Sequence, residues 1–148
     1  MEPLGAVLPG TWRVLATTFP MWLSGKRLEP TFTYTLLSSE PLVLHDEVRY
    51  RTRSGRSRGI TGRDTFDPVS GRFVWRHRLL GPLTSRWRVV HLSDDHELVV
   101  LTFDKSLVTP PGMDVIGRGD ADRPGARAAV PLDRLGEERA QFEALRWL

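Results

Sequence analysis

Hydrophobic and polar residues alternate along most of the chain with a period of two. In residues 31–37 aromatic and apolar side chains alternate with threonines, and in residues 72–80 they alternate with arginines. This alternation is typical of strands with one buried and one exposed face. Turn residues such as Pro9-Gly10 separate the segments. The pattern predicts eight strands, within residues 8–19, 31–37, 42–52, 59–67, 72–80, 85–92, 97–103 and 113–118.

Eight short strands in sequence order favour a closed sheet. An open antiparallel sheet of this length would leave two exposed edges, and closure removes both. We therefore expect an all-β protein, with an eight-stranded antiparallel up-and-down barrel over residues 1–118. Residues 119–130 shift to Gly, Ala, Asp and Arg and predict a linker. Residues 131–148 start with proline and carry a sparse apolar stripe, which predicts a C-terminal helix docked on the barrel.

Large aromatic side chains share one face of the predicted strands. A barrel of eight strands is either filled by side chains or holds one small ligand. If this face is the inner one, its aromatic residues would line a ligand cavity. The residues that we expect to contact the ligand are Tyr34, Tyr50, Trp75, Trp87 and Phe103.

Four ionisable residues share this apolar face, namely Asp46, Asp64, His77 and His91. A buried carboxyl group without a partner costs several kcal/mol or takes up a proton. One interpretation is a functional cavity in which Asp46, Asp64 and His77 perform acid-base catalysis and His91 contacts the ligand. The other is structural, with the carboxylates paired to arginines on neighbouring strands or turned outward by a β-bulge.

The sequence resembles a lipocalin-like (calycin) barrel of bacterial type. The resemblance is carried by Gly10-Thr11-Trp12 at the first strand, a long first loop, eight successive strands and a helix after the last strand. It implies that Trp12 plugs the closed end and that Arg118 stacks across it. It also implies that the first loop covers the open mouth with Met21 and Trp22, so that Trp22 contacts the ligand. A helix-grip (START-like) fold is the alternative, but residues 20–30 are too short for its two helices.

Composition narrows the classes of function. The chain has 148 residues, no cysteine and a net charge of +3. Disulfides, thiolate catalysis and Cys-ligated zinc are therefore excluded. No histidine follows His96, where the resembling haem-binding nitrobindins have a ligand, so we expect no haem. His45, Asp46 and Glu47 are adjacent in a strand and point to alternate faces, so they cannot chelate one metal. We expect no metal and no cofactor.

Arginine supplies 19 of the 21 basic residues, a bias that a GC-rich bacterial genome explains. Six arginines fall within residues 49–63, on the face opposite to the aromatic residues. Surfaces that bind nucleic acids interleave basic and aromatic side chains on one face. The separation of the two here favours a solvated barrel exterior, and no nucleic-acid partner is expected. No run of about 18 apolar residues spans a membrane. The first residues lack a signal-peptide pattern, which predicts a cytoplasmic protein.

These observations predict that the barrel binds a small hydrophobic or amphipathic molecule in its cavity. The alternative is a metal-free cyclase or isomerase that folds a secondary-metabolite-like substrate in the same cavity and uses Asp/His acid-base chemistry. The pattern leaves the identity of the ligand and the oligomeric state open.

Overall fold

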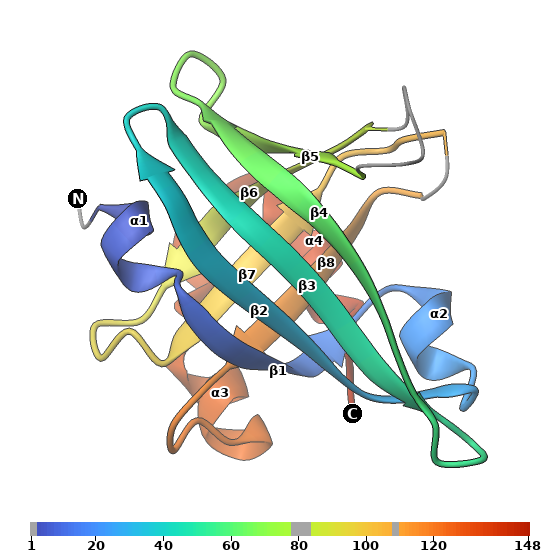
Figure 1. Cartoon of the computed structure of the whole chain (residues 1–148). Helices are drawn as coiled ribbons and strands as arrows, with labels where there is room; N and C mark the ends of the chain where they lie inside the picture. The colour runs from blue at the N-terminus through green and yellow to red at the C-terminus, as the bar shows by residue number, and fades with distance from the viewer. Residues whose placement is uncertain (1–2, 78–83, 108–109) are drawn as a thin grey trace.

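The computed structural model describes residues 3–77, 84–107 and 110–148. Eight antiparallel strands follow one another around a barrel (Figure 1). The barrel closes because the first strand pairs with the second through residues 10–13 and with the eighth through residues 13–17. The expectation of a closed, eight-stranded up-and-down barrel is confirmed. The strands are β1 (Gly10–Thr17), β2 (Arg27–Ser39), β3 (Leu42–Thr52), β4 (Ser57–Asp67), β5 (Arg72–Arg76), β6 (Thr84–Leu92), β7 (Leu98–Phe103) and β8 (Gly112–Gly117).

The strand limits agree with the alternating segments to within a few residues, except at β2 and β5. β2 starts four residues earlier than expected, at Arg27. β5 ends at Arg76, and residues 78–80 of the expected strand lie outside the described part of the chain. Two short helices that the pattern did not predict flank β1, namely α1 (Leu4–Val7) and α2 (Pro20–Leu23). No described helix is long and apolar enough to cross a membrane.

The C-terminal region differs from the sequence-based expectation. Residues 119–130 were expected as a linker but contain α3 (Arg123–Ala129), whose N-cap Asp122 accepts a hydrogen bond from the backbone N–H of Gly125. A C-terminal helix is present as expected, but it is short and does not span residues 131–148. Gly136 has a φ of +56°, and this left-handed conformation interrupts a continuous helix. The segment instead forms turns of 3₁₀-helix at Leu132–Arg134 and Gly136–Glu138, then α4 (Arg139–Glu143) and β9 (Arg146–Trp147).

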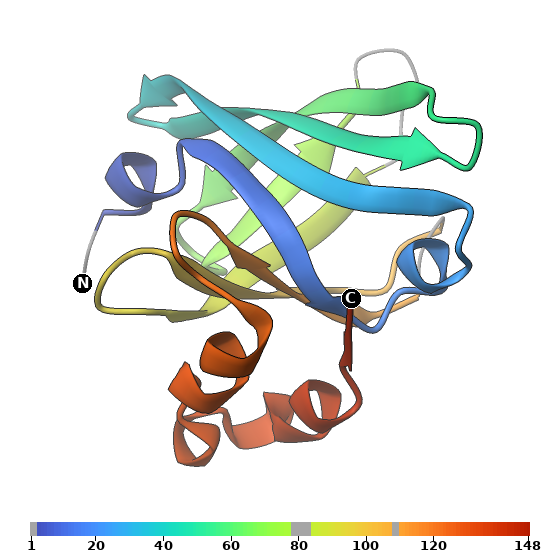
Figure 2. The same cartoon turned by 90° about the horizontal axis from the view of Figure 1, so that it is seen from below.

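Two hydrophobic cores lie on the two sides of strands β7 and β8. The inner core fills part of the barrel and includes Trp12, Phe73 and Trp87. The outer core joins the outward side chains of β7 and β8 to Ala126, Phe142 and other apolar residues of the C-terminal region. This region lies below the barrel in Figure 2. Because both faces of β8 are covered, all six of its residues are buried.

β9 occupies an edge of β1 that β2 leaves unpaired. Ala16 and Thr17 pair with Trp147 and Arg146, and the backbone N–H of Leu148 donates to the carbonyl oxygen of Leu15 at 2.9 Å. The C-terminal residues therefore complete the hydrogen bonding of β1 beyond the point where β2 diverges.

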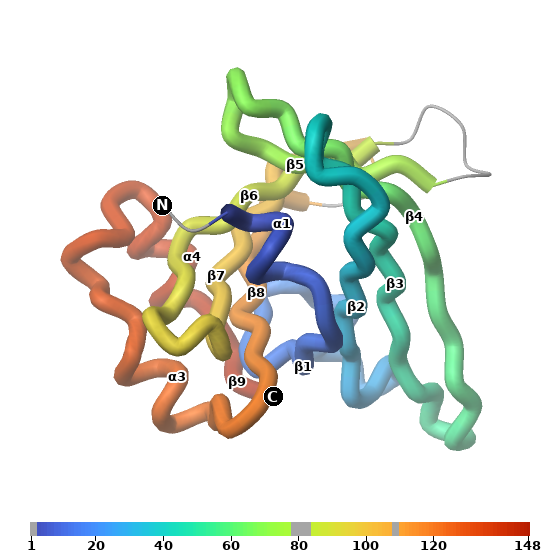
Figure 3. Tube along the Cα trace, turned by 60° about the vertical axis from the view of Figure 1, so that its left-hand side comes forward, coloured from blue at the N-terminus to red at the C-terminus, as the bar shows by residue number. Residues whose placement is uncertain are grey.

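The start of β1 is held at one end of the barrel, beside α1 (Figure 3). Trp12 is fully buried, and its indole N–H donates to the carbonyl oxygen of Leu8 at 2.9 Å. Arg118 lies over the Trp12 ring, with Cζ 4.1 Å from the ring centroid. Its guanidinium donates to the carbonyl oxygens of Pro9 and His96. The stacking that the resemblance implied for Trp12 and Arg118 is therefore present.

Candidate functional site

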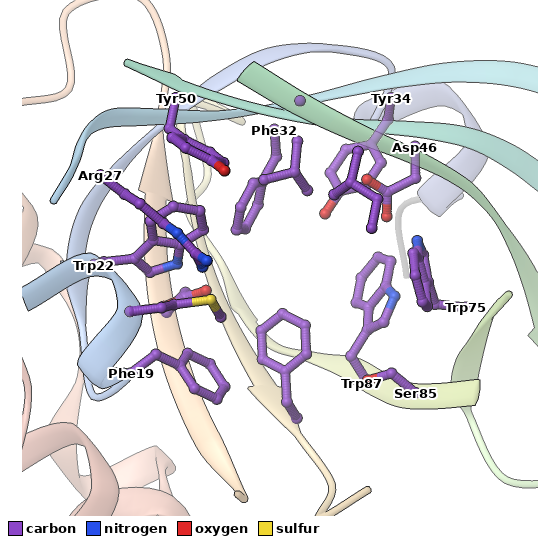
Figure 4. Close-up of a pocket in the computed structure, with 16 residues that line it drawn as sticks. Phe19, Trp22, Arg27, Phe32, Tyr34, Asp46, Tyr50, Trp75, Ser85 and Trp87 are labelled. Atoms are coloured by element: carbon purple, nitrogen blue, oxygen red, sulfur yellow. The ribbon is translucent and has the colours of Figure 1, made fainter. Parts of the chain in front are cut away.

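A cavity of about 410 Å³ opens inside the barrel, toward the end where α2 lies. Half of its sixteen lining residues are aromatic, and the side chains in Figure 4 point from several strands into one shared space. Four of the lining residues are charged or polar. The aromatic ones are Phe19, Trp22, Phe32, Tyr34, Tyr50, Trp75, Trp87 and Phe103, and the polar ones are Arg27, Asp46, Ser85 and Asp114.

The sequence pattern located most of this wall. The cavity is lined by six of the seven residues that we expected to contact a ligand: Trp22, Tyr34, Tyr50, Trp75, Trp87 and Phe103. Their strands pair in register, so inward residues on neighbouring strands face one another across the ladder, as Phe73 faces Trp87 and Trp87 faces Phe103. The contact of these side chains with a ligand stays a prediction.

The aromatic rings pack against one another and so hold the wall in place. Trp87 stacks on Phe73 with ring centroids 4.3 Å apart, and it also stacks on Tyr34 at 5.7 Å. Trp22 and Tyr50 contact edge to face at 5.9 Å. Arg27 is exposed and lies over the Tyr50 ring, with Cζ 5.3 Å from its centroid. These contacts restrict the rotamers of side chains that a ligand would touch.

Helix α2 places the first loop beside the cavity. Pro20 occupies the first turn of this helix, where its missing N–H costs nothing. Met21 and Trp22 both line the cavity, in the region where the resemblance placed them. The buried indole nitrogen of Trp22 has no hydrogen-bond partner among the described residues.

Asp46 and Asp64 form a buried carboxyl pair. Asp46 faces Tyr34 across the β2–β3 ladder and lines the cavity, whereas Asp64 is fully buried and is not among the lining residues. The two carboxyl groups hydrogen-bond each other, which requires one proton between them. The indole N–H of Trp87 donates to Asp64 Oδ1 at 2.9 Å. The structure therefore brings together two of the three residues predicted as catalytic.

Burial is the main reason that both carboxyl groups hold protons more tightly than usual. Desolvation raises the pKa of Asp46, and the hydrogen bond with Asp64 and the nearby His45 oppose that rise. Desolvation raises the pKa of Asp64 further, and the charge of Asp46 adds to it. A carboxylate pair in a site of low polarity cannot ionise fully because the second charge meets the first. The pair therefore keeps a proton to higher pH than an ordinary carboxyl group does.

Sequence reasoning missed Asp114. It faces Leu101 on β7 and Thr17 on β1, lines the cavity, and is 1% exposed. Its Oδ1 atom has no hydrogen-bond partner in the described part of the chain. Burial raises the pKa of Asp114 to about 7, and a hydrogen bond with Thr17 opposes the rise. The available signal was a charged residue within the otherwise apolar strand of residues 112–117.

Two predicted histidines do not line the cavity. The pairing of β6 with β7 shifts between Val89 and His91, and His91 then faces Val100, whose side chain belongs to the outer core. This bulge turns His91 outward, so its predicted contact with a ligand is wrong. His77 follows the last residue of β5, with its ring centroid 6.0 Å from that of Trp75, and is not among the lining residues. His77, the third residue predicted as catalytic, therefore does not line the cavity with Asp46.

All six arginines of residues 49–63 are exposed. Arg58 pairs with Tyr50 and shares its inner face near the end of the β3–β4 hairpin. Arg49 and Arg51 lie on the outer face. Arg51 forms an ion pair with Glu29 at 2.6 Å, and Arg49 forms one with Glu47 at 3.8 Å. The solvated exterior that the alternation predicted is present for the outer-face arginines, and Arg58 is an exception. Within the described ranges, no group of three or more His, Asp or Glu side chains is placed to hold a metal ion.

The chain matches known proteins through its backbone alone. No protein-family model and no curated protein sequence matches it. A biogenic amine-binding protein superposes with a TM-score of 0.69 at 11% identity, over 99% of this chain and 80% of that one. Lobster apocrustacyanin A1 gives 0.64 at 10% identity, over 96% and 77%. The bovine lipocalin allergen Bos d 2 gives 0.61 at 12% identity, over 97% and 93%.

These likenesses cover nearly the whole of this chain. At such identities they show the fold alone. The chain has the lipocalin, or calycin, fold.

Proposed function

We propose that this protein binds a small hydrophobic or amphipathic molecule inside its barrel. The observation that carries the proposal is the cavity of about 410 Å³, whose wall is mainly aromatic and includes a few polar groups. Ligand pockets typically have such volumes and combine apolar walls with a small number of polar anchors. A barrel whose purpose was structural would gain stability from filling this space, because interiors pack densely.

The fold is consistent with this proposal. Barrels of eight strands are wide enough to hold one small ligand, as those of lipocalins do. One of the similar structures is, by its name, an amine-binding protein. The resemblance in the first loop adds a mouth covered by Met21 and Trp22, and both side chains lie at the cavity. A ligand inside would be shielded from water on most sides.

A cavity-blocking substitution tests the proposal. Val48 lines the cavity, and Val48→Trp would fill space that a ligand needs. N-phenyl-1-naphthylamine, an uncharged dye that fluoresces in apolar surroundings, should bind the wild-type protein with a rise in its emission. Val48→Trp should weaken that binding at least tenfold. Val69→Trp places the same side chain on a position that is 95% exposed and should leave binding unchanged.

The outcome can contradict the proposal in two ways. The wild-type protein would show no binding of the dye, or Val48→Trp would bind it as well as Val69→Trp does. Circular dichroism of each variant checks that the barrel has formed before the titrations are compared.

A second candidate function is isomerisation or cyclisation of a bound polyene or ketone. The observation that favours it is the hydrogen-bonded pair of Asp46 and Asp64, in which Asp64 holds its proton more tightly and Asp46, at the cavity wall, would act as a general base. Asp46→Asn should then abolish turnover of such a substrate while its affinity remains within about threefold. Unchanged turnover in this variant would contradict the catalytic role.

A further inference from the structure

The barrel interior holds an excess of acidic groups. Asp46, Asp64 and Asp114 are each 6% exposed or less. Burial is the main cause of the raised pKa of the Tyr34 phenol, and the charges of all three aspartates add to it. The three carboxyl groups therefore lie around one region of the barrel interior. Arg27 is the one cation among the described lining residues, and it is exposed and lies over Tyr50 at the mouth. No buried lysine or arginine in the described wall compensates these carboxyl groups.

Each of the three carboxyl groups has one buried oxygen without a hydrogen-bond partner among the described residues, namely Asp46 Oδ1, Asp64 Oδ2 and Asp114 Oδ1. Asp64 does not line the cavity, and Asp46 is paired with it. Asp114 lines the cavity outside this pair, and its unpartnered atom is Oδ1. An unpaired carboxylate in such a place costs several kcal/mol, which a cationic hydrogen-bond donor would remove. The free oxygen lies on a side chain that lines the cavity, so a ligand can reach it.

The surroundings of Asp114 suit the apolar part of such a ligand. Gly112 lies two residues before Asp114 on the same face of β8 and pairs with Phe103. A side chain at Gly112 would collide with the Phe19 ring, so Phe19 packs directly on this backbone. Phe19 and Phe103 contact edge to face at 5.4 Å. Aromatic rings therefore continue along the wall from the carboxyl group toward the mouth, and such rings also attract cations.

We infer that the ligand is an amphipathic amine, whose ammonium group donates to Asp114 and whose apolar body lies along Phe19 and Phe103. This inference rests on the proposed function, since it specifies the chemistry of a molecule bound in the same cavity. The paired carboxyl groups of Asp46 and Asp64 add negative potential near the ammonium group without being its direct partner. Arg27 at the mouth leaves the cationic end of the ligand oriented inward, because like charges repel.

Three probes of matched shape test this inference by calorimetry on the wild-type protein at pH 8. They are 2-(2-naphthyl)ethylamine, 2-(2-naphthyl)ethanol and 3-(2-naphthyl)propanoate, which share a ring system and differ in the polar end. We expect the amine to bind at least tenfold more tightly than the alcohol. The carboxylate should bind more weakly than the alcohol because it meets the acidic wall.

Asp114→Asn should abolish the preference for the amine and leave the affinity for the alcohol within about threefold. Asp133→Asn removes the same charge from an exposed position in the C-terminal region and should keep the preference. Asparagine is nearly the size of aspartate, so the Asp114 variant retains the cavity, and binding of the alcohol verifies that it has folded.

The possible results distinguish failure of the amine inference from failure of the proposed binding function. Equal binding of amine and alcohol, or tighter binding of the carboxylate, would overturn the amine inference and leave the proposed function standing. A preference for the amine that persists in Asp114→Asn would also overturn it. Failure of all three probes, together with failure of the uncharged dye, would overturn both.

Discussion

At the scale of the residue, Asp114 shows how a buried carboxyl group links protonation to stability. Its carboxyl group is surrounded by Tyr34, Thr17 and Leu101, with the acidic Asp46 and Asp64 nearby. Desolvation disfavours the charged form, which is why the pKa of Asp114 rises to about 7. In the unfolded chain the same group has an ordinary aspartate pKa. The folded state therefore binds more protons than the unfolded state between these two values.

The free energy of unfolding should therefore fall as the pH rises from about 4 to about 7. Protonated Asp114 is compatible with burial, whereas ionised Asp114 lowers stability by up to about 4 kcal/mol. Asp46 and Asp64 contribute in the same direction because burial also raises their pKa values. Urea unfolding at pH 5 and pH 8 measures the effect. Asp114→Asn should be more stable than wild type at pH 8 and should lose much of the pH dependence.

The matched control for this measurement is Asp133→Asn, which removes an exposed carboxyl group. It should retain the wild-type difference between pH 5 and pH 8. An Asp114→Asn protein with the full wild-type pH dependence would contradict the assignment of the effect to Asp114.

The period of two placed some polar residues on the correct face of the sheet and misplaced others. Asp46 and Asp64 occupy the inner positions that the period of two assigned to them. His91 does not, because the bulge after Val89 reverses the direction of the residues that follow. Asp114 was not predicted to line the cavity because β8 is covered on both faces, and such strands show little alternation of apolar and polar residues. A bulge and a covered strand both arise from neighbouring elements, which a local pattern does not record.

At the scale of the element, the outer core gives the C-terminal region its place. Phe142 of α4 is 6% exposed and packs in a cluster with Met113 and Val115 of β8. The short helices of this region would not be stable alone, because isolated helices of this length do not hold together in water. Their conformation therefore depends on contact with the barrel.

Phe142→Ala should lower the free energy of unfolding by about 3 kcal/mol, since it removes a buried aromatic ring and leaves a cavity. It should leave the affinity for N-phenyl-1-naphthylamine unchanged, because the sheet separates the outer core from the ligand cavity. Chemical denaturation and dye titration measure the two quantities. Leu132→Ala, at a position that is 37% exposed, should cost much less. A large loss of dye affinity in Phe142→Ala would show that the two cores are coupled.

The strands were predictable with most of their limits, whereas in the C-terminal region only the presence of a helix was predictable. The alternation within β3 or β4 spans many residues and has one physical meaning, a sheet with two different faces. Residues 119–148 contain glycines and prolines that interrupt the apolar pattern, and their conformation depends on Gly136 and on the outer surface of β7 and β8. The hydrophobic pattern of residues 119–148 contains no information about the outer surface of β7 and β8.

At the scale of the whole molecule, Arg118 ties together segments that are distant in sequence. It covers Trp12 and donates to the carbonyl oxygens of Pro9 at 2.9 Å and His96 at 3.0 Å. The N-terminal segment, the turn before β7 and the end of β8 thus meet at one guanidinium group. Gly10 has a φ of +131°, and a side chain there would approach the Arg118 guanidinium to 3.0 Å. The spacing Gly-x-Trp therefore leaves room for the arginine.

Arg118→Ala should lower the free energy of unfolding by about 2 kcal/mol through loss of the cation–π contact and two hydrogen bonds. Thermal unfolding followed by near-ultraviolet circular dichroism, which reports on buried tryptophan, checks this. Arg123→Ala removes an exposed arginine from the first turn of α3 and should cost far less. Equal losses in both variants would contradict a closing role for Arg118.

The sequence by itself determined the barrel and most of the aromatic wall. A period of two in hydrophobicity is a local property, and burial of one face of each strand enforces it throughout the sheet. The tertiary structure alone decided three further features: that Asp114 joins the cavity, that His91 leaves it, and that the C-terminal region forms short helices. Each of these depends on which segments meet in space. The free energy that fixes them comes from contacts between residues far apart in the chain.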